Sequence, residues 1–268
     1  MDNRPVGVFD SGLGGLTAVR ELRRLLPNED IVYFGDTGRC PYGTKGRVTI
    51  ERFAAQDIRF LLGFNVKVIV IACNTVSSVA LEMASEMSPV PVVGVIESAA
   101  RAASAATKSG KIGVLGTFTT ITSGRYEQAL HALQPSLTVT GRACPMFVPL
   151  VENGYFGRDC RVAEIIAHEY LDELRGTVDT LILGCTHYPI LKGMIADIMG
   201  DGVALIDTGR ETAMEAARLL EHRGLLKDGG DGSARFFVSD RTDDFARLAA
   251  ILLGSPIENV GLVKIDQY

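Results

Sequence analysis

Two of the five cysteines stand at corresponding places in the chain and are the first candidates for chemistry. Cys73 ends the apolar run of VKVIVIACNT at 66–75, and Cys185 ends that of VDTLILGCTH at 178–187. At each place a strand is expected to give way to a helix. Because the dipole at the start of a helix stabilises a thiolate, we expect both thiols to have a lowered pKa and to be reactive.

The other three cysteines, at 40, 144 and 160, do not form a pattern typical of disulfides or zinc ligands. The total is odd, and no pair has C-x-x-C spacing. We interpret Cys144 and Cys160 as structural. No lysine stands at the end of an expected strand, where a pyridoxal enzyme would need its Schiff base, and Lys45 is interpreted as a loop charge. The sequence therefore predicts no cofactor and no metal.

Strand-like runs alternate with helical patterns through almost the whole chain. Apolar residues recur with helical spacing at 16–26, 48–64, 161–174, 211–223 and 243–253. The strand-like runs are Val6–Phe9, Ile31–Phe34, Val66–Ala72, Val92–Ile96, Lys111–Leu115, Leu137–Thr140, Val178–Leu183, Val203–Ile206, Ala234–Val238 and Val260–Ile265. Such alternation predicts an α/β protein with parallel sheets covered by helices on both faces. The stretch 227–233 indicates a surface loop.

The chain also resembles itself. The segment VGVFDS at 6–11 aligns with IGVLGT at 112–117, and 66–75 aligns with 178–187 in the same order. The repeat predicts two similar lobes related by pseudo-two-fold symmetry, with the active site in the cleft between them. We expect residues 1–96 and 208–268 to form the first lobe, residues 97–207 to form the second, and hinges to lie near 97 and 207.

Small polar residues follow the expected strands, at the edge where parallel sheets bind ligands. Two equivalent lobes would bring Cys73 and Cys185 to opposite faces of one ligand there. Racemisation at a carbon acid needs that arrangement, since one thiolate removes the Cα proton and the opposite thiol delivers a proton to the other face. A hydrolase with one cysteine does not need the second thiol, and a disulfide oxidoreductase would need the sulfurs within bonding distance.

The glycine-rich segment 12–15 leaves another interpretation open. It follows an expected strand and opens a helix, and Asp36 lies 22 residues after Gly14, as in a dinucleotide site. However, Thr17 replaces the third glycine of that motif, and Asp10 would oppose a pyrophosphate. The backbone N–H groups of the same loop suit a smaller anion, to which Ser11 adds a hydroxyl.

Five motifs spread over almost the whole chain resemble those of the aspartate/glutamate racemase superfamily. They are DSGLGG at 10–15, PYG at 41–43, ACNT at 72–75, GTFTTITS at 116–123 and GCTHYP at 184–189. PYG together with GCTHYP is similar to the glutamate-specific members, since aspartate-specific relatives typically carry glutamate where His187 stands. The resemblance implies cofactor-independent interconversion of L- and D-glutamate, which provides D-glutamate for bacterial peptidoglycan and thus for cell-wall biogenesis and cell shape.

The resemblance also implies roles for individual residues. Cys73 and Cys185 would be the two acid/base groups, and Asp10, Glu152 and His187 would assist proton transfer. The residues expected to hold the amino acid are Asp10, Ser11, Pro41, Tyr42, Gly43, Asn74, Thr75, Thr117, Thr120, Thr186 and His187.

The residue types are consistent with those roles. A thiol of ordinary pKa is only a few per cent thiolate at neutral pH, so a neighbouring base would help it. Asp10 could serve Cys73 in this way, and His187, two residues after Cys185, could serve the second thiol. Cys40, just before PYG, is not a position that the motif requires.

Composition excludes several other classes of protein. Lys and Arg number 27 against 32 Asp and Glu, giving a net charge of −5, which argues against a nucleic-acid surface. No apolar stretch is long enough for a transmembrane helix, and the first residues show no signal-peptide pattern. We therefore expect a cytoplasmic protein with a small-molecule partner, glutamate, and neither nucleic acid nor membrane. The oligomeric state is left open, with a homodimer as one form.

Two alternative functions also stay open. A relative acting on aspartate, hydantoins or maleate would keep both cysteines and change the pocket for the substrate side chain. A non-catalytic ligand-binding protein could be built on the same duplicated lobes, but binding alone would not require the two thiols.

Overall fold

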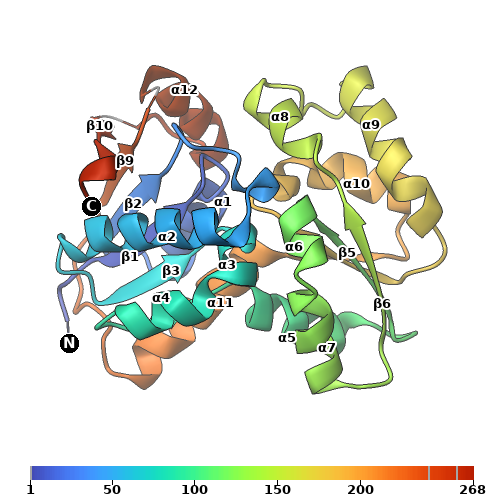
Figure 1. Ribbon diagram of the computed structural model, residues 1–268, viewed down its shortest axis with the longest axis horizontal. Helices are drawn as coiled ribbons and strands as arrows, with labels where there is room; N and C mark the ends of the chain where they lie inside the picture. The colour runs from blue at the N-terminus through green and yellow to red at the C-terminus, as the bar shows by residue number, and fades with distance from the viewer. Residues whose placement is uncertain (1, 241, 258) are drawn as a thin grey trace.

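The computed structural model describes residues 2–240, 242–257 and 259–268, and in these ranges the chain forms two parallel sheets. The first sheet has the strand order β10-β9-β2-β1-β3-β4, and the second has the order β6-β5-β7-β8. Figure 1 shows the two sheets side by side, each with helices packed on it. The α/β class and the two parallel-sheet cores predicted from the sequence are confirmed.

The first sheet is built from six strands in parallel register. They are β1 (Val6–Asp10), β2 (Ile31–Gly35), β3 (Val68–Ile71), β4 (Val92–Val93), β9 (Ala234–Val238) and β10 (Gly261–Leu262). Alternate residues of β1 face opposite cores, since Val6 and Val8 pack with α1 and α11 whereas Phe9 packs with α2 and α3. Burial on both faces explains why these strands are continuous apolar runs.

The second sheet repeats the arrangement of the central strands of the first. Its strands are β5 (Lys111–Gly116), β6 (Thr138–Ala143), β7 (Thr180–Gly184) and β8 (Ala204–Asp207). Val6 of β1 pairs with Val68 of β3, and Ile112 of β5 pairs with Thr180 of β7, as the internal alignment of the sequence requires. The order 2-1-3-4 thus recurs as 6-5-7-8, so the predicted repeat is present at the level of strand order and register.

Helices cover both faces of each sheet (Figure 1). Beside the first sheet lie α1 (Leu16–Leu25), α2 (Arg47–Leu62), α3 (Asn74–Val79), α4 (Leu81–Met87), α11 (Thr208–His222) and α12 (Thr242–Leu253). Beside the second lie α5 (Ile96–Ala106), α6 (Phe118–Thr122), α7 (Arg125–Leu133), α8 (Phe147–Glu152), α9 (Arg161–Leu171) and α10 (Lys192–Met199). Short 3₁₀ turns are η1 (Tyr42–Thr44), η2 (Asp172–Leu174), η3 (Tyr188–Leu191) and η4 (Ile265–Gln267).

The amphipathic pattern of α1 shows why these segments are helical. Leu16, Val19 and Leu22 recur at spacings of three and are buried, while Arg20 and Arg24 lie on the solvent side. The helix thereby covers one face of the first sheet, next to α11. None of the helices in the described ranges combines the length and the apolar composition that crossing a membrane would require.

The C-terminal segment returns to the first sheet. Strand β9 pairs with β2, in the register Ile31 to Ala234, and α11 packs against α1. The predicted loop 227–233 contains no helix or strand. The domain limits given above, 1–96 with 208–268 and 97–207, stay a prediction.

Two expected strands are much shorter in the structure. The run 92–96 forms only the two-residue β4, because the buried residue Ile96 already belongs to α5. The run 260–265 forms only the two-residue β10, followed by η4. A short, uniformly apolar run occurs both in buried strands and at the start of buried helices. Since such a run has no hydrophobic period, the sequence does not show which of the two it forms.

Candidate active site

The carboxyl ends of the central strands of both sheets border one small cavity. Its empty volume is about 290 Å³. That size suits a small molecule better than a dinucleotide. The lining residues are Ser11, Cys40, Pro41, Tyr42, Gly43, Cys73, Asn74, Thr75, Thr117, Val148, Cys185, Thr186 and His187.

Most of the residues singled out in the sequence meet at this cavity. Three others from that set lie immediately behind its wall rather than on it. Asp10 bonds to Thr186, Glu152 to His187, and Thr120 to Thr117. The structure therefore brings the whole candidate set together, while the role of each residue stays a prediction.

The two thiols reach the cavity from equivalent strands. Cys73 follows β3 and Cys185 follows β7, and the exposed fractions of the two residues are only 4% and 6%. The thiol of Cys73 contacts the Oγ of Ser11 at 3.6 Å. The thiol of Cys185 lies 3.8 Å from Nδ1 of His187. Both sulfurs are thus shielded from bulk water and face the space in which a ligand would lie.

The expectation that a helix dipole lowers the pKa of the Cys73 thiol is wrong. Helix α3, which Cys73 precedes, has only six residues, and the turn η3 after Cys185 begins three residues later, at Tyr188. Burial raises the pKa of Cys73 to about 12, and the negative charge of Asp10 adds to this effect. Removal of the thiolate from water therefore outweighs the helix dipole at Cys73.

His187 connects the second thiol to a carboxylate. Its Nε2 lies 3.1 Å from Oε1 of Glu152, and its Nδ1 faces the sulfur of Cys185. Burial opposes a positive charge on the ring, yet the hydrogen bonds to Cys185 and Glu152 raise the pKa of His187 to about 10. An imidazolium here would stabilise a thiolate at Cys185 and could exchange a proton with it.

Asp10 organises the glycine-rich loop from inside. Its Oδ2 accepts hydrogen bonds from the backbone N–H groups of Gly12, at 3.2 Å, and Gly15, at 3.0 Å. The hydroxyl of Thr186 donates to the same carboxylate. Burial raises the pKa of Asp10, and the charge of His187 opposes that rise. Two of the N–H groups that were expected to bind a small anion are therefore already occupied by Asp10, and anion binding by the rest of the loop stays a prediction.

Hydroxyl and amide groups form the rest of the wall. The Oγ1 atoms of Thr75 and Thr117 are 3.0 Å apart, and Thr117 and Thr120 are separated by the same distance. Asn74 accepts a hydrogen bond from Tyr126 at 2.6 Å and donates one to Thr208 at 3.3 Å. The contacts of Thr75 with Thr117 and of Asn74 with Tyr126 join α3, beside the first sheet, to segments that belong to the second.

The PYG segment is held by a buried ionic network. The hydroxyl of Tyr42 contacts the carboxylates of both Asp36 and Asp57. Arg39 bonds to the same two carboxylates at 2.6 and 3.1 Å. Asp36 also accepts a hydrogen bond from Ser239 at 2.7 Å. In a dinucleotide site the carboxylate of Asp36 would bind the ribose. Here it is buried in this network, which disfavours dinucleotide binding.

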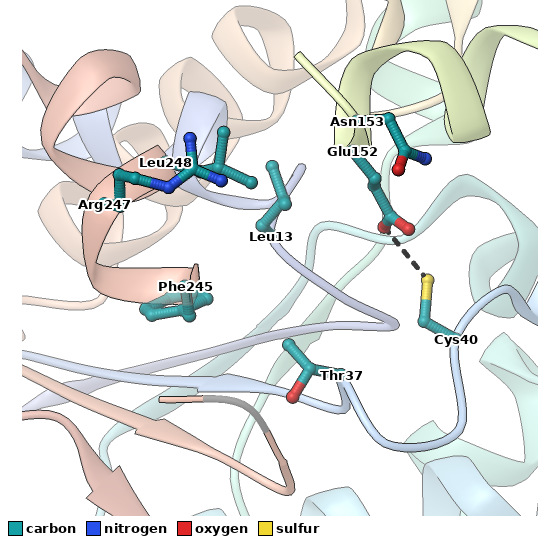
Figure 2. A pocket seen from close by; sticks show the side chains of 8 residues that line it. All are labelled: Leu13, Thr37, Cys40, Glu152, Asn153, Phe245, Arg247 and Leu248. Carbon is teal, nitrogen blue, oxygen red and sulfur yellow. Dashed lines mark hydrogen bonds between the residues drawn. The ribbon is translucent and has the colours of Figure 1, made fainter. Parts of the chain in front are cut away.

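The sequence analysis did not identify Cys40 as a residue that contacts the site. Its Sγ donates to Oε1 of Glu152 at 3.3 Å, and it borders a second cavity as well as the first. Figure 2 shows this second cavity, with Cys40 and Glu152 on one side and Arg247 and Leu248 on the other. Its position directly before PYG was the only available signal, because its partner lies 112 residues away.

In residues 2–240, 242–257 and 259–268, no three His, Cys, Asp or Glu side chains gather in a way that could hold a metal ion.

Comparison with known proteins gives a family match and close relatives. The family model described as Asp/Glu/Hydantoin racemase matches residues 16–216. A curated glutamate racemase from Bacillus cereus is 44% identical over 267 residues, which cover 99% of this chain and 98% of the relative.

Solved structures agree with the sequence relatives. A glutamate racemase isoform from Bacillus anthracis superposes with a TM-score of 0.94 at 41% identity, covering 98% of both chains. The glutamate racemase of Francisella tularensis, solved in complex with D-glutamate, has a TM-score of 0.93 at 40% identity and covers both chains completely.

Proposed function

The chain belongs to the Asp/Glu/hydantoin racemase family, and we propose that it interconverts L- and D-glutamate with Cys73 and Cys185 as its two acid/base groups. One observation carries the proposal. Two buried thiols follow equivalent strands of two equivalent sheets and line the same small cavity. The D-glutamate formed would supply peptidoglycan synthesis.

Each half of the reaction is a proton transfer at Cα. One thiolate takes the Cα proton and becomes a thiol, while the electron pair left on carbon is delocalised into the α-carboxylate. The opposite thiol then donates its proton to the other face of Cα and becomes a thiolate. The product is the mirror image of the substrate, and the enzyme is left ready for the reverse reaction. The proposal needs no cofactor.

The two thiols have different neighbours, and these suit different roles at the start of the reaction. The raised pKa of Cys73 keeps its proton at neutral pH, which suits the donor role. At the other thiol, the imidazole of His187, whose pKa is raised to about 10, lies 3.8 Å from the sulfur of Cys185 and would offset negative charge there when that thiol acts as the acceptor. Glu152 would hold the imidazole in place, and Asp10 would fix the loop that faces Cys73.

Substrate binding would rely mainly on neutral groups. The hydroxyls of Ser11, Thr75 and Thr117, together with the amide of Asn74, border the cavity. Neutral donors can hold a carboxylate without binding either enantiomer too tightly for release. The identities of 41–45% to proteins named glutamate racemase favour glutamate over aspartate, hydantoins or maleate.

We further propose the compartment, the oligomeric state and the hinges of the protein. The cytoplasm is the compartment expected from the sequence, and all five cysteines are free thiols. A homodimer, and hinges near 97 and 207 between the lobes 1–96 with 208–268 and 97–207, belong to the same proposal.

Proton NMR in D2O tests the function directly. Purified protein is incubated with L-glutamate without pyridoxal phosphate or added metal, and the products are then separated by chirality. We expect loss of the Cα proton signal and formation of D-glutamate. Folded protein that leaves glutamate unchanged but exchanges the Cα proton of aspartate or a hydantoin would contradict the assignment of the substrate.

Two variants test the roles of the thiols. Cys73→Ala and Cys185→Ala should each abolish racemisation and leave the circular dichroism spectrum unchanged. Cys160→Ala is the matched control, because it removes a thiol that does not line the cavity. If either of the first two variants kept normal turnover in both directions, the two-base mechanism would be wrong.

A further inference from the structure

Four side chains form a line of polar contacts that ends at the second thiol. Cys40 donates to Oε1 of Glu152 at 3.3 Å. The same oxygen lies 3.1 Å from Nε2 of His187, whose Nδ1 lies 3.8 Å from the sulfur of Cys185. We propose that Cys40 is a positioning residue, whose thiol holds Glu152 in the orientation that fixes the imidazole serving Cys185. This inference rests on the proposed function of the same site.

Glu152 lies at the edge of the second cavity. It is the last residue of α8, and its side chain is 30% exposed. On the side away from His187 it borders the second cavity, which has about 800 Å³ of empty volume. Figure 2 shows the carboxylate directed toward Cys40, with Leu13 between it and Arg247 and Leu248 of α12. Loss of the thiol would remove one of the contacts that orient this carboxylate.

The chemistry of Cys40 suits a donor rather than a base. Burial raises the pKa of its thiol far above the ordinary value, and the charge of Glu152 raises it further. The sulfur therefore keeps its proton at the pH of the reaction. A protonated thiol beside a carboxylate donates a weak hydrogen bond, and Oε1 can accept this bond together with the contact from Nε2 of His187.

The surrounding loop leaves space for this contact. A Cβ atom placed on Gly12 would lie 3.1 Å from the sulfur of Cys40 and 3.3 Å from Oε1 of Glu152. Both distances are shorter than ordinary van der Waals contacts. Glycine at this position thus allows the two side chains to meet, although they come from elements of different sheets.

The test compares Cys40→Ala, Cys40→Ser and the control Cys160→Ala. We expect Cys40→Ala to lower kcat by about ten- to a hundred-fold, as displacement of a catalytic group does, with KM changed less than twofold. Cys40→Ser keeps a donor and should restore most of kcat. Cys160→Ala should behave like the wild type. The loss of kcat/KM must be equal in both directions, since the two enantiomers have the same free energy in solution.

A second measurement follows the imidazole directly. The titratable groups that face His187 are Cys185, Glu152 and Asp10. If Glu152 turns away in Cys40→Ala, the NMR titration midpoint of His187 should fall below its wild-type value, and Cys40→Ser should reverse the change. A merely structural role of Cys40 would not move this midpoint selectively.

Gly12→Ala provides a probe that leaves the thiol in place. The new Cβ should press Cys40 and Glu152 apart and lower kcat. In the double variant with Cys40→Ala, Gly12→Ala should lower kcat less than it does alone, because the contact between Cys40 and Glu152 is already lost. If Cys40→Ala retained the wild-type kcat and midpoint, or if Cys40→Ser were as impaired as Cys40→Ala, the proposal would be overturned. Wild-type protein that fails to racemise glutamate, while Cys40→Ala still shifts the midpoint, would refute the proposed function but not the positioning.

Discussion

Nδ1 of His187 lies 3.8 Å from the sulfur of Cys185. In the other half of the molecule the neighbour of the thiol is different, since Cys73 contacts a hydroxyl from the loop after β1, that of Ser11, at 3.6 Å. The two sheets have the same strand order, so the difference arises in the loops and not in the framework. The two proton transfers therefore use different helper groups, and each helper can be tested separately.

The first prediction concerns the charge of His187. Its pKa is raised to about 10 against burial by the hydrogen bonds to Cys185 and Glu152. A raised pKa means that the folded protein keeps this proton at neutral pH, when a free imidazole has mostly lost it. NMR of labelled histidine should show an imidazolium at pH 8 that titrates near pH 10 and is absent from His187→Gln. A midpoint below pH 7 would contradict the ion pair.

The second prediction concerns stability at alkaline pH. The pKa of Cys73 rises from 9.0 to about 12 through burial and the charge of Asp10. Between these values the unfolded chain releases the thiol proton and the folded chain does not, so stability is full below pH 9 and is lost as pH rises toward 12. Urea unfolding from pH 8 to 10.5 should show a decline that is shallower in Cys73→Ala, by up to about 1.4 kcal/mol per pH unit. Parallel curves for the two proteins would contradict the buried thiol.

The framework was predictable from the sequence because its signals are local or repeated. The strand runs around Cys73 and Cys185 align at a nearly constant offset, and the carboxyl ends of parallel strands meet at one edge. These two facts suffice to place both thiols at one site. The lengths of β4 and β10 were not predictable, since apolar runs carry no period that marks where a strand ends.

The electrostatics required the packed structure. A helix dipole is typically worth about 0.3–1 kcal/mol to a neighbouring charge, whereas raising the pKa of Cys73 from 9.0 to about 12 corresponds to ~4 kcal/mol against the thiolate. The sequence shows the helix but not the depth of burial. In the same way, the contact of Cys40 with Glu152 joins residues 112 positions apart, and no local pattern indicates it.

The third prediction concerns the close approach of the glycine-rich loop to the second thiol's loop. A Cβ on Gly14 would lie 2.4 Å from Oγ1 of Thr186 and 2.7 Å from Nδ1 of His187. Gly14→Ala must therefore displace the imidazole, and we expect kcat to fall about a hundred-fold. Gly46→Ala is the matched control, because nothing lies within 4 Å of its Cβ. Equal activity of the two variants would show that the loops can separate without consequence.

The fourth prediction concerns the ionic network behind Tyr42. Asp36 and Asp57 are fully buried and share the guanidinium of Arg39. Arg39→Met leaves buried carboxylates without their cation and should cost about 3–5 kcal/mol of unfolding free energy. Burial raises the pKa of Asp57, which favours a neutral group at this place, so Asp57→Asn should cost less than Arg39→Met and no more than about 1.5 kcal/mol. Urea denaturation measures both, and an equal loss in the two variants would contradict this order.

The fifth prediction is that opening of the cavity limits turnover. Cys73 and Cys185 are 4% and 6% exposed, and the Oγ1 atoms of Thr75 and Thr117, which line the same cavity, are 3.0 Å apart, so we expect substrate entry and product release to require opening of the cavity. Motions of this kind commonly set kcat. We expect kcat to fall as solvent viscosity rises, with only a small Cα-deuterium isotope effect. In Gly14→Ala, where proton transfer is slowed, the viscosity dependence should vanish and the isotope effect should increase. A wild-type kcat that is independent of viscosity and shows a full isotope effect would instead make proton transfer the slow step.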